Sequence, residues 1–209
     1  MDIQKIYSLI FKLGKWREKR FQLFLKIIKP SMKDNLLDIG GYPHNWKFFF
    51  HHFNKITCLN LRKKKNNEIE NLISVEGDGR KLEFDNNEFD IVFSNSVIEH
   101  VGDFEDQKLF SKEILRVGKK FWIQTPSKSF FFEPHFLFPF FHWFPIPIRK
   151  ILVYITPWYL ISKPDKDRID IMINTTRLLS KKELKILFPN CSIITERFLF
   201  FPKSYIVFR

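Results

Sequence analysis

From residue 35 onward, short apolar runs alternate with longer stretches of helical character. A strand, a helix and a second strand form the βαβ unit, which sets strands parallel and places helices on the faces of the sheet. This alternation predicts an α/β fold with a mostly parallel sheet between two layers of helices. The runs expected to form its parallel strands are 36–39, 56–61, 72–75, 89–93 and 121–124.

Local signals place the remaining elements. Asp103, with Asp106 in the first turn, favours a helix over about 103–117, because acidic side chains suit the positive end of the helix dipole. Ser180 and Glu183 have the spacing of a capping box, which predicts a helix that ends near residue 187. A further helix is expected over about 44–53. Two late strands, at about 191–199 and 204–208 and joined by Pro202-Lys203, predict an antiparallel edge.

The length of 209 residues allows one domain with at most a small appendage. We expect a basic amphipathic helical arm over 1–33 and a single α/β domain over 34–209. Within the domain, residues 127–162 are dense in Phe, Trp and Pro and have no clear period, which is typical of a lid or an insertion. The alternatives for these aromatic residues are that they pack in the core or an interface, or that they enter a membrane interface together with the basic arm.

Positive charge is concentrated at the N-terminus. The chain has 35 Lys and Arg against 23 Asp and Glu, a formal net charge of +12, and residues 1–33 hold nine basic against two acidic residues, or 9 − 2 = +7 of it. Apolar residues recur there at helical spacing. The arm is therefore interpreted either as a membrane-surface or nucleic-acid-binding helix, or as a helix packed on the domain with a solvated basic face.

Several classes of protein are excluded by pattern. Cys58 and Cys191 have neither the partners nor the spacing of a disulfide framework or a zinc knuckle. The apolar runs are too short to span a bilayer, and charges interrupt any signal-peptide core near the N-terminus. Neither GxGxxG nor GxxxxGK[ST] occurs, which argues against a dinucleotide and a P-loop nucleotide. We expect a cytoplasmic protein, with peripheral membrane contact left open.

The informative residues follow the strands, because ligands of an open parallel sheet bind beyond the carboxyl ends of its strands. Gly40 and Gly41 follow the first strand and let the backbone approach a ligand closely. In order, the chain carries DIGG, GDGRKLEF, FDIVFSNSVIEHV and WIQTPS. Over about residues 35–145, this series resembles the class I S-adenosylmethionine-dependent methyltransferases of the type 11 kind.

The resemblance implies a Rossmann-like, doubly wound sheet in three α/β/α layers with an antiparallel edge strand. It also implies S-adenosyl-L-methionine as cofactor and methyl transfer to a small-molecule or lipid-like acceptor. The alternatives are a nucleic-acid methyltransferase or binder that uses the basic arm, and a non-catalytic interaction protein on the same fold. The partners expected are the acceptor and an anionic membrane surface, with nucleic acid ranked lower.

By the same resemblance, the cofactor lies along the loops after the first four strands. The glycine turn faces its methionine part, Asn60 stands where an acid usually accepts the ribose hydroxyls, and Asp78 takes the adenine-binding position. Ser94 and Asn95 end the fourth strand beside the sulfonium. The full cofactor set implied is Asp38, Gly40, Gly41, Asn60, Asp78, Gly79, Arg80, Ser94 and Asn95.

Two histidines are the candidate catalytic residues. His100 follows the fourth strand, and His135 lies in Phe132-Glu133-Pro134-His135. An imidazole that titrates near neutral pH can take a proton from an acceptor hydroxyl or amine. In some relatives a Glu-x-x-Glu-His run ligates a metal at this place, but Ser96 stands here for the first Glu, so no metal site is expected. Structural roles for Glu99, His100 and His135 remain open alternatives.

Overall fold

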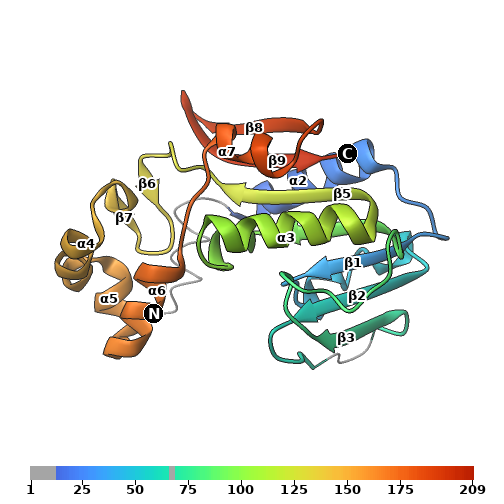
Figure 1. The fold of residues 1–209 in the computed structure, drawn as a ribbon, viewed down its shortest axis with the longest axis horizontal. Coiled ribbons are helices and arrows are strands. Elements are labelled where there is room, and N and C mark those ends of the chain that lie inside the picture. The colour runs from blue at the N-terminus through green and yellow to red at the C-terminus, as the bar shows by residue number, and fades with distance from the viewer. Residues whose placement is uncertain (1–12, 66–68) are drawn as a thin grey trace.

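The computed structural model describes residues 13–65 and 69–209 (Figure 1). Part of the predicted basic arm, residues 1–12, lies outside the described residues. The fold centres on a seven-stranded sheet of order β3-β2-β1-β4-β5-β9-β8. Its strands are β1 Asn35–Ile39, β2 Lys55–Asn60, β3 Leu72–Glu76, β4 Phe89–Asn95, β5 Gly118–Pro126, β8 Ser192–Phe198 and β9 Phe201–Phe208.

Strands β1 to β5 pair in parallel, and β9 lies antiparallel between β5 and β8. This confirms the predicted mostly parallel, doubly wound sheet and its antiparallel edge. The strand order reverses between β1 and β4, since the chain moves outward through β2 and β3 on one side and through β5 on the other. Ligands of such sheets bind at this switch point.

Alternate residues of the central strands enter two separate cores, because side chains point to opposite faces of a strand. One face of the sheet packs against α3 Phe104–Val117 and α7 Lys181–Leu187, and the other against α2 Leu13–Ile28 (Figure 1). Within β5, for example, Ile123 lies in the first core and Trp122 in the second. The result is the predicted three-layer arrangement.

Helix α2 packs on the sheet along its described side chains. Phe24 is fully buried and its ring meets Phe93 and Trp122 edge-on, at centroid distances of 5.3 and 5.6 Å. Arg20 forms an ion pair with Glu196 of β8 at 2.7 Å. The helix therefore forms one side of the domain core, and among its described side chains Lys19 and Lys26 are exposed.

Two helix signals are confirmed and one prediction is wrong. Helix α3 begins with Asp103 in a capping box, and α7 begins with the Ser180–Glu183 box. Residues 44–53 do not form a regular α-helix; they form the 3-10 turns η1 Pro43–Trp46 and η2 Phe50–His52. His, Asn and aromatic residues have low helix propensity, and burial of Trp46 and Phe53 holds the segment in this irregular path.

The turn between the two late strands is also corrected. Pro202 and Lys203 lie inside β9, and the chain turns at Leu199-Phe200, where Leu199 has a φ of 53°. A register shift between Glu196 and Arg197 places Pro202 opposite Arg197. A proline is tolerated beside such an irregularity, because the ladder there can lack one N–H donor.

Residues 127–175 form a helical insertion with a core of its own. Its elements are the hairpin β6 Phe132–Glu133 and β7 Phe138–Pro139, then η4 Phe141–Trp143, α4 Ile146–Leu152, η5 Val153–Ile155, α5 Pro157–Ser162 and α6 Lys166–Thr175. Phe136, Phe141 and Trp158 are buried there, so part of the aromatic run is core. The described helices include none that is long and apolar enough to cross a bilayer.

Candidate active site

Backbone hydrogen bonds tie the strand-end loops together at the switch point. The Gly40 amide donates to the Leu59 carbonyl at 2.7 Å, and the Gly77 amide donates to the Asn60 carbonyl at 2.9 Å. The Ser96 amide donates to the Gln124 carbonyl at 2.9 Å. Ser94 of β4 also donates to the Ile39 carbonyl of β1, so the ends of β1 to β4 form one continuous rim. The predicted cofactor residues and His100 lie on this rim or in the strand ends directly beneath it.

The turn after β1 requires both of its glycines. Gly40 has a φ of +78°, which L side chains rarely adopt. A Cβ at Gly41 would lie 1.5 Å from the Asp38 carboxylate oxygen Oδ2. The Asp38 side chain thus occupies the space directly under the turn, and the turn can pass over it only as bare backbone.

Asp38 is an anchor beneath this turn. Its side chain is 2% exposed, and Trp46 Nε1 donates to its Oδ2 at 2.7 Å. Burial raises the pKa of Asp38 to about 7, against the opposing effect of the Trp46 hydrogen bond. The carboxyl group therefore fixes the loop from Gly40 to Trp46 and does not point into solvent.

Asn60, at the end of β2, faces the same turn. Its Nδ2 donates to the Gly41 carbonyl at 2.8 Å. Among the residues that the structure describes, none donates a hydrogen bond to its Oδ1. The Asn60 Nδ2 therefore stabilises the glycine turn, while its Oδ1 can accept a hydrogen bond from a hydroxyl group of a ligand.

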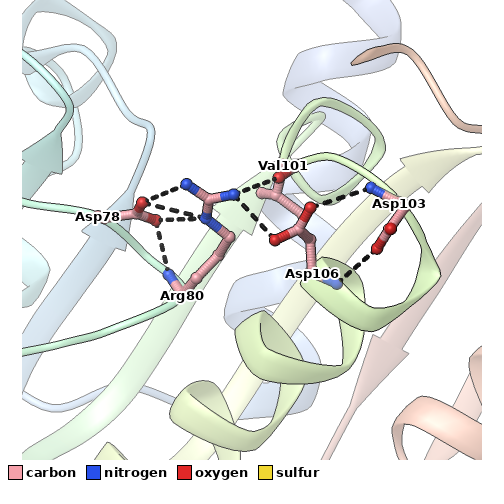
Figure 2. A network of polar contacts seen from close by, with 5 residues as sticks. All are labelled: Asp78, Arg80, Val101, Asp103 and Asp106. Carbon is pink, nitrogen blue, oxygen red and sulfur yellow. Dashed lines mark hydrogen bonds and ion pairs between the residues drawn. The ribbon is translucent and has the colours of Figure 1, made fainter. Parts of the chain in front are cut away.

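Asp78 and Arg80, after β3, are held in a polar network (Figure 2). The Arg80 backbone amide and guanidinium donate to the Asp78 carboxylate, with the shortest contact from Nη2 to Oδ2 at 2.6 Å. The hydrogen bonds from Arg80 lower the pKa of Asp78, and the same pairing raises that of Arg80. Arg80 therefore occupies much, but not all, of the acceptor capacity of Asp78.

The same guanidinium reaches the start of α3. Arg80 Nη1 donates to Asp106 Oδ1 at 2.9 Å and to the Val101 carbonyl at 3.2 Å. Asp106 is itself part of the cap of α3, through its bonds with Asp103 (Figure 2). Gly79 lies beneath, where a Cβ would be 2.6 Å from the Phe110 ring. The loop after β3 is thus fastened to the helix after β4.

The last two residues of β4 have different surroundings. Ser94 is fully buried and its hydroxyl donates to the Ile39 carbonyl at 3.1 Å, so it braces β1. Asn95 is partly exposed, and its Oδ1 accepts from Arg20 Nη1 at 3.0 Å. Sequence reasoning missed Arg20, because nothing in the helical pattern of the arm marks one basic residue among many.

The structure brings the two predicted histidines together from distant parts of the chain. His100 Nε2 and His135 Nε2 lie 3.1 Å apart, with their rings nearly perpendicular. Glu133 Oε1 lies 2.7 Å from His135 Nδ1, and Thr125 Oγ1 donates to Glu99 Oε2 at 3.0 Å. Glu133 was not among the predicted site residues, although its place two residues before His135 was a signal that could have identified it.

Burial and neighbouring charges shift the pKa values of His100, His135 and Glu99 in different directions. Neighbouring atoms displace water around the His100 ring, although part of its side chain is exposed, and together with His135 they lower the pKa of His100 to about 4. Burial alone would lower the pKa of His135, but the charge of Glu133 and its hydrogen bond raise it. Burial raises the pKa of Glu99 to about 7. Strongly shifted groups that meet at one place are typical of a functional site.

The comparisons with known proteins point to one family. Residues 42–120 match the profile described as "Methyltransferase domain". No curated protein shows a significant match. The fold is similar to a protein from Pyrococcus horikoshii OT3, at 16% identity and a TM-score of 0.56, with 95% of this chain and 90% of that chain covered.

A second similar structure is described as one of the SAM-dependent methyltransferases and comes from Methanosarcina mazei. It is 13% identical, with a TM-score of 0.53 and coverage of 85% of this chain and 92% of that chain. At such identities the structures speak for the fold alone. The domain profile supports the resemblance recognised from the ordered strand-end motifs, and the structures confirm the fold that it implies.

Proposed function

We propose that this chain is a class I methyltransferase of the type 11 kind and that it transfers the methyl group of S-adenosyl-L-methionine to a small-molecule or lipid-like acceptor. One observation supports this most strongly: the glycine turn, Asn60 and Asp78 share one continuous rim that leads to the His100–His135 pair. A cofactor bound along that rim would have its reactive end near two imidazoles.

The residues present fit this cofactor. The amide oxygen of Asn60 is available to a ribose hydroxyl, and the Asp78 carboxylate keeps acceptor capacity for an exocyclic amine. The glycine turn offers bare backbone to the amino-acid part. Asp38 and Ser94 support the rim from below, since both are buried and hydrogen-bonded within the protein.

Once bound, the sulfonium supplies an already activated methyl group, so the protein mainly aligns the acceptor and excludes water. If only protein side chains act on the methyl acceptor, the His100–His135 pair would take the proton that the acceptor loses. Glu133 stabilises a positive charge on His135, whose raised pKa makes it the better proton holder of the two. His100, with its lowered pKa, stays neutral and relays the proton between acceptor and His135.

A lipid-like acceptor is supported by the surface of the helical insertion. Ile151 and Leu160 are 73% and 60% exposed, and Phe200 at the β8–β9 turn is 89% exposed. Exposed apolar side chains that form a contiguous patch are typical of an interaction or membrane surface, and we propose that these side chains form one. The proposed partner is an anionic membrane surface, approached by the insertion and attracted by the basic residues of the segment 1–33.

The acceptor class is tested with S-adenosylmethionine that carries a labelled methyl group. The protein is incubated with a lipid extract, an aqueous small-molecule extract and total RNA in separate reactions. We expect protein-dependent label in one of the two small-molecule fractions, reduced at least 10-fold by His135→Ala. Label in RNA would favour a nucleic-acid methyltransferase, and no transfer to any fraction would count against the acceptor class.

A further inference from the structure

The two facing imidazoles pose an electrostatic problem. Glu133 is buried, and an ionised carboxylate can only accept hydrogen bonds. The His135 Nδ1 therefore carries a hydrogen, which it donates to Glu133 Oε1 at 2.7 Å. The Nε2 of a neutral His135 then has a lone pair, and it points at His100 Nε2 only 3.1 Å away. At this distance either the His100 Nε2 carries a hydrogen that it donates to this lone pair, or a cation lies between the two nitrogens.

The distances suit a cation. In tetrahedral zinc sites the histidine nitrogens lie about 2.0–2.1 Å from the metal, which places two of them roughly 3.3 Å apart. The separation of 3.1 Å between the two Nε2 atoms is close to this value. A Glu99 carboxylate oxygen and one nitrogen of each imidazole all lie within 4.8 Å of one another.

Glu99 supplies an independent observation. Its side chain is fully buried, and Thr125 satisfies Oε2, but Oε1 has no hydrogen-bond partner among the described residues. A buried carboxylate oxygen without a partner is costly. A cation held by the two Nε2 atoms would satisfy it and would offset the second buried carboxylate, that of Glu133.

The outer contacts also match those of a metal centre. A histidine that ligates a metal through one ring nitrogen usually donates the N–H of the other to a carboxylate or a neutral oxygen, which fixes the orientation of the ring. Glu133 has this position behind His135, and the Thr176 hydroxyl lies 3.5 Å from His100 Nδ1. Both Nε2 atoms are thus aimed inward by groups on the far side of each ring.

We infer that Glu99, His100 and His135 bind a divalent transition-metal cation of the Zn²⁺ class, with Glu133 positioning His135. Ser96, in place of the first Glu of a Glu-x-x-Glu-His run, had led us to expect no metal here. The inferred site does not need that Glu, because its third ligand, His135, comes from the helical insertion. Three protein ligands leave a fourth position open, as in sites that bind water or a substrate oxygen.

The cation would have two consequences. It joins the loop after β4 to the hairpin of the insertion, and so fixes the insertion over the site. Its role in methyl transfer rests on the proposed function: an acceptor oxygen at the open position would lose its proton more readily, because the cation stabilises the resulting anion. The imidazoles then hold the cation, and the proton passes to a water molecule instead of to the His100–His135 pair.

The test uses the untagged full chain, freed of metal by a chelator and then titrated with Zn²⁺ by calorimetry and with Co²⁺ by visible absorption. We expect one equivalent of Zn²⁺ per chain and the intense visible bands of Co²⁺ bound with low coordination number. His135→Ala and Glu99→Gln should each weaken Zn²⁺ binding by about 100-fold or more, and Glu133→Gln by about 10–100-fold. His51→Ala, which changes an exposed histidine outside the cluster, should leave binding unchanged.

Two results would overturn the inference: no stoichiometric Zn²⁺ binding, or binding that His135→Ala leaves intact. Circular dichroism of each metal-free variant shows whether it folds, and His100→Ala, at an exposed position, provides a second ligand variant. Binding of S-adenosylhomocysteine is measured separately. Zn²⁺ binding without cofactor binding would contradict the proposed function and leave the metal site standing.

Discussion

Asp38 is a carboxyl group that the fold holds away from water, and its titration should be visible in stability. Burial raises its pKa from 3.8 to about 7. Between these values the folded chain keeps a proton that the unfolded chain has lost, so this group makes stability fall as the pH rises from about 4 to 7.

Asp38→Asn should remove this contribution, because an amide oxygen can still accept from Trp46 Nε1 but does not titrate. We expect the free energy of unfolding of the variant to depend less on pH than that of the wild type, by a few kcal/mol across the interval at about 1.4 kcal/mol per pKa unit. Denaturant titrations at several pH values measure it. Parallel pH profiles for the two proteins would show that Asp38 already ionises near its usual pKa.

Asp78 is predicted to serve both the cofactor and Arg80. Asp78→Asn keeps the size of the side chain and one acceptor oxygen, but it loses the charge that holds the guanidinium. We expect the affinity for S-adenosylhomocysteine to fall at least 10-fold, measured by calorimetry. Glu105→Gln is the matched control, since Glu105 forms an ion pair on α3 that is outside this network. Equal losses in both variants would mean that Asp78 does not contact the cofactor.

At the scale of elements, helix α2 is joined to β8 by one partly buried ion pair. The side chains of Arg20 and Glu196 are 14% and 11% exposed, and Arg20 also contacts Asn95 on the site rim. Removal of one partner leaves the other carrying a charge with little water around it, which is more costly than loss of a surface pair.

Arg20→Met should therefore lower the free energy of unfolding by about 2–4 kcal/mol. Lys19→Met, one residue away on the exposed face, should change it by less than about 0.5 kcal/mol. Urea denaturation of both variants and of Glu196→Gln measures the effect, and the double variant gives the coupling. If Arg20→Met and Lys19→Met lower the free energy of unfolding by similar amounts, the ion pair does not hold α2 in place.

The elements differ in how far the sequence could predict them. The five parallel strands and the caps of α3 and α7 follow local rules, and they were predicted. The helices of the insertion were not, because α4 and α5 are short and begin with proline in the first turn, so no long apolar period marks them. The turn at Leu199-Phe200 contains neither glycine nor proline, so no local signal marks it. The nearby Pro202 is a stronger turn signal, and the turn was therefore predicted at Pro202-Lys203.

The candidate site shows a similar division. Its rim could be predicted, because strand ends are read from local pattern and the order of the motifs is specific. The meeting of His100 with His135 and the contact of Arg20 with Asn95 could not, since each joins segments whose separation depends on the packing of the whole insertion or of α2.

At the scale of the whole molecule, the exposed apolar face of the insertion should bind membranes. Ile151 and Ile155 are 73% and 60% exposed. Replacement of both by Ser should reduce co-sedimentation with phosphatidylserine-containing vesicles at least 10-fold, because burial of one such side chain is worth roughly 1.5–3 kcal/mol. Ile186→Ser is the control, since Ile186 is 63% exposed but lies on α7. If all three proteins sediment alike, the insertion does not face the membrane.

The central claim is that the rim formed by the loops after β1, β2 and β3 binds the methyl donor. Isothermal titration of the full chain with S-adenosylmethionine and S-adenosylhomocysteine tests it most directly. The account predicts one site per chain for each ligand, with the affinity for S-adenosylhomocysteine reduced at least 10-fold by Asn60→Ala. No binding of either ligand at millimolar concentration would contradict it.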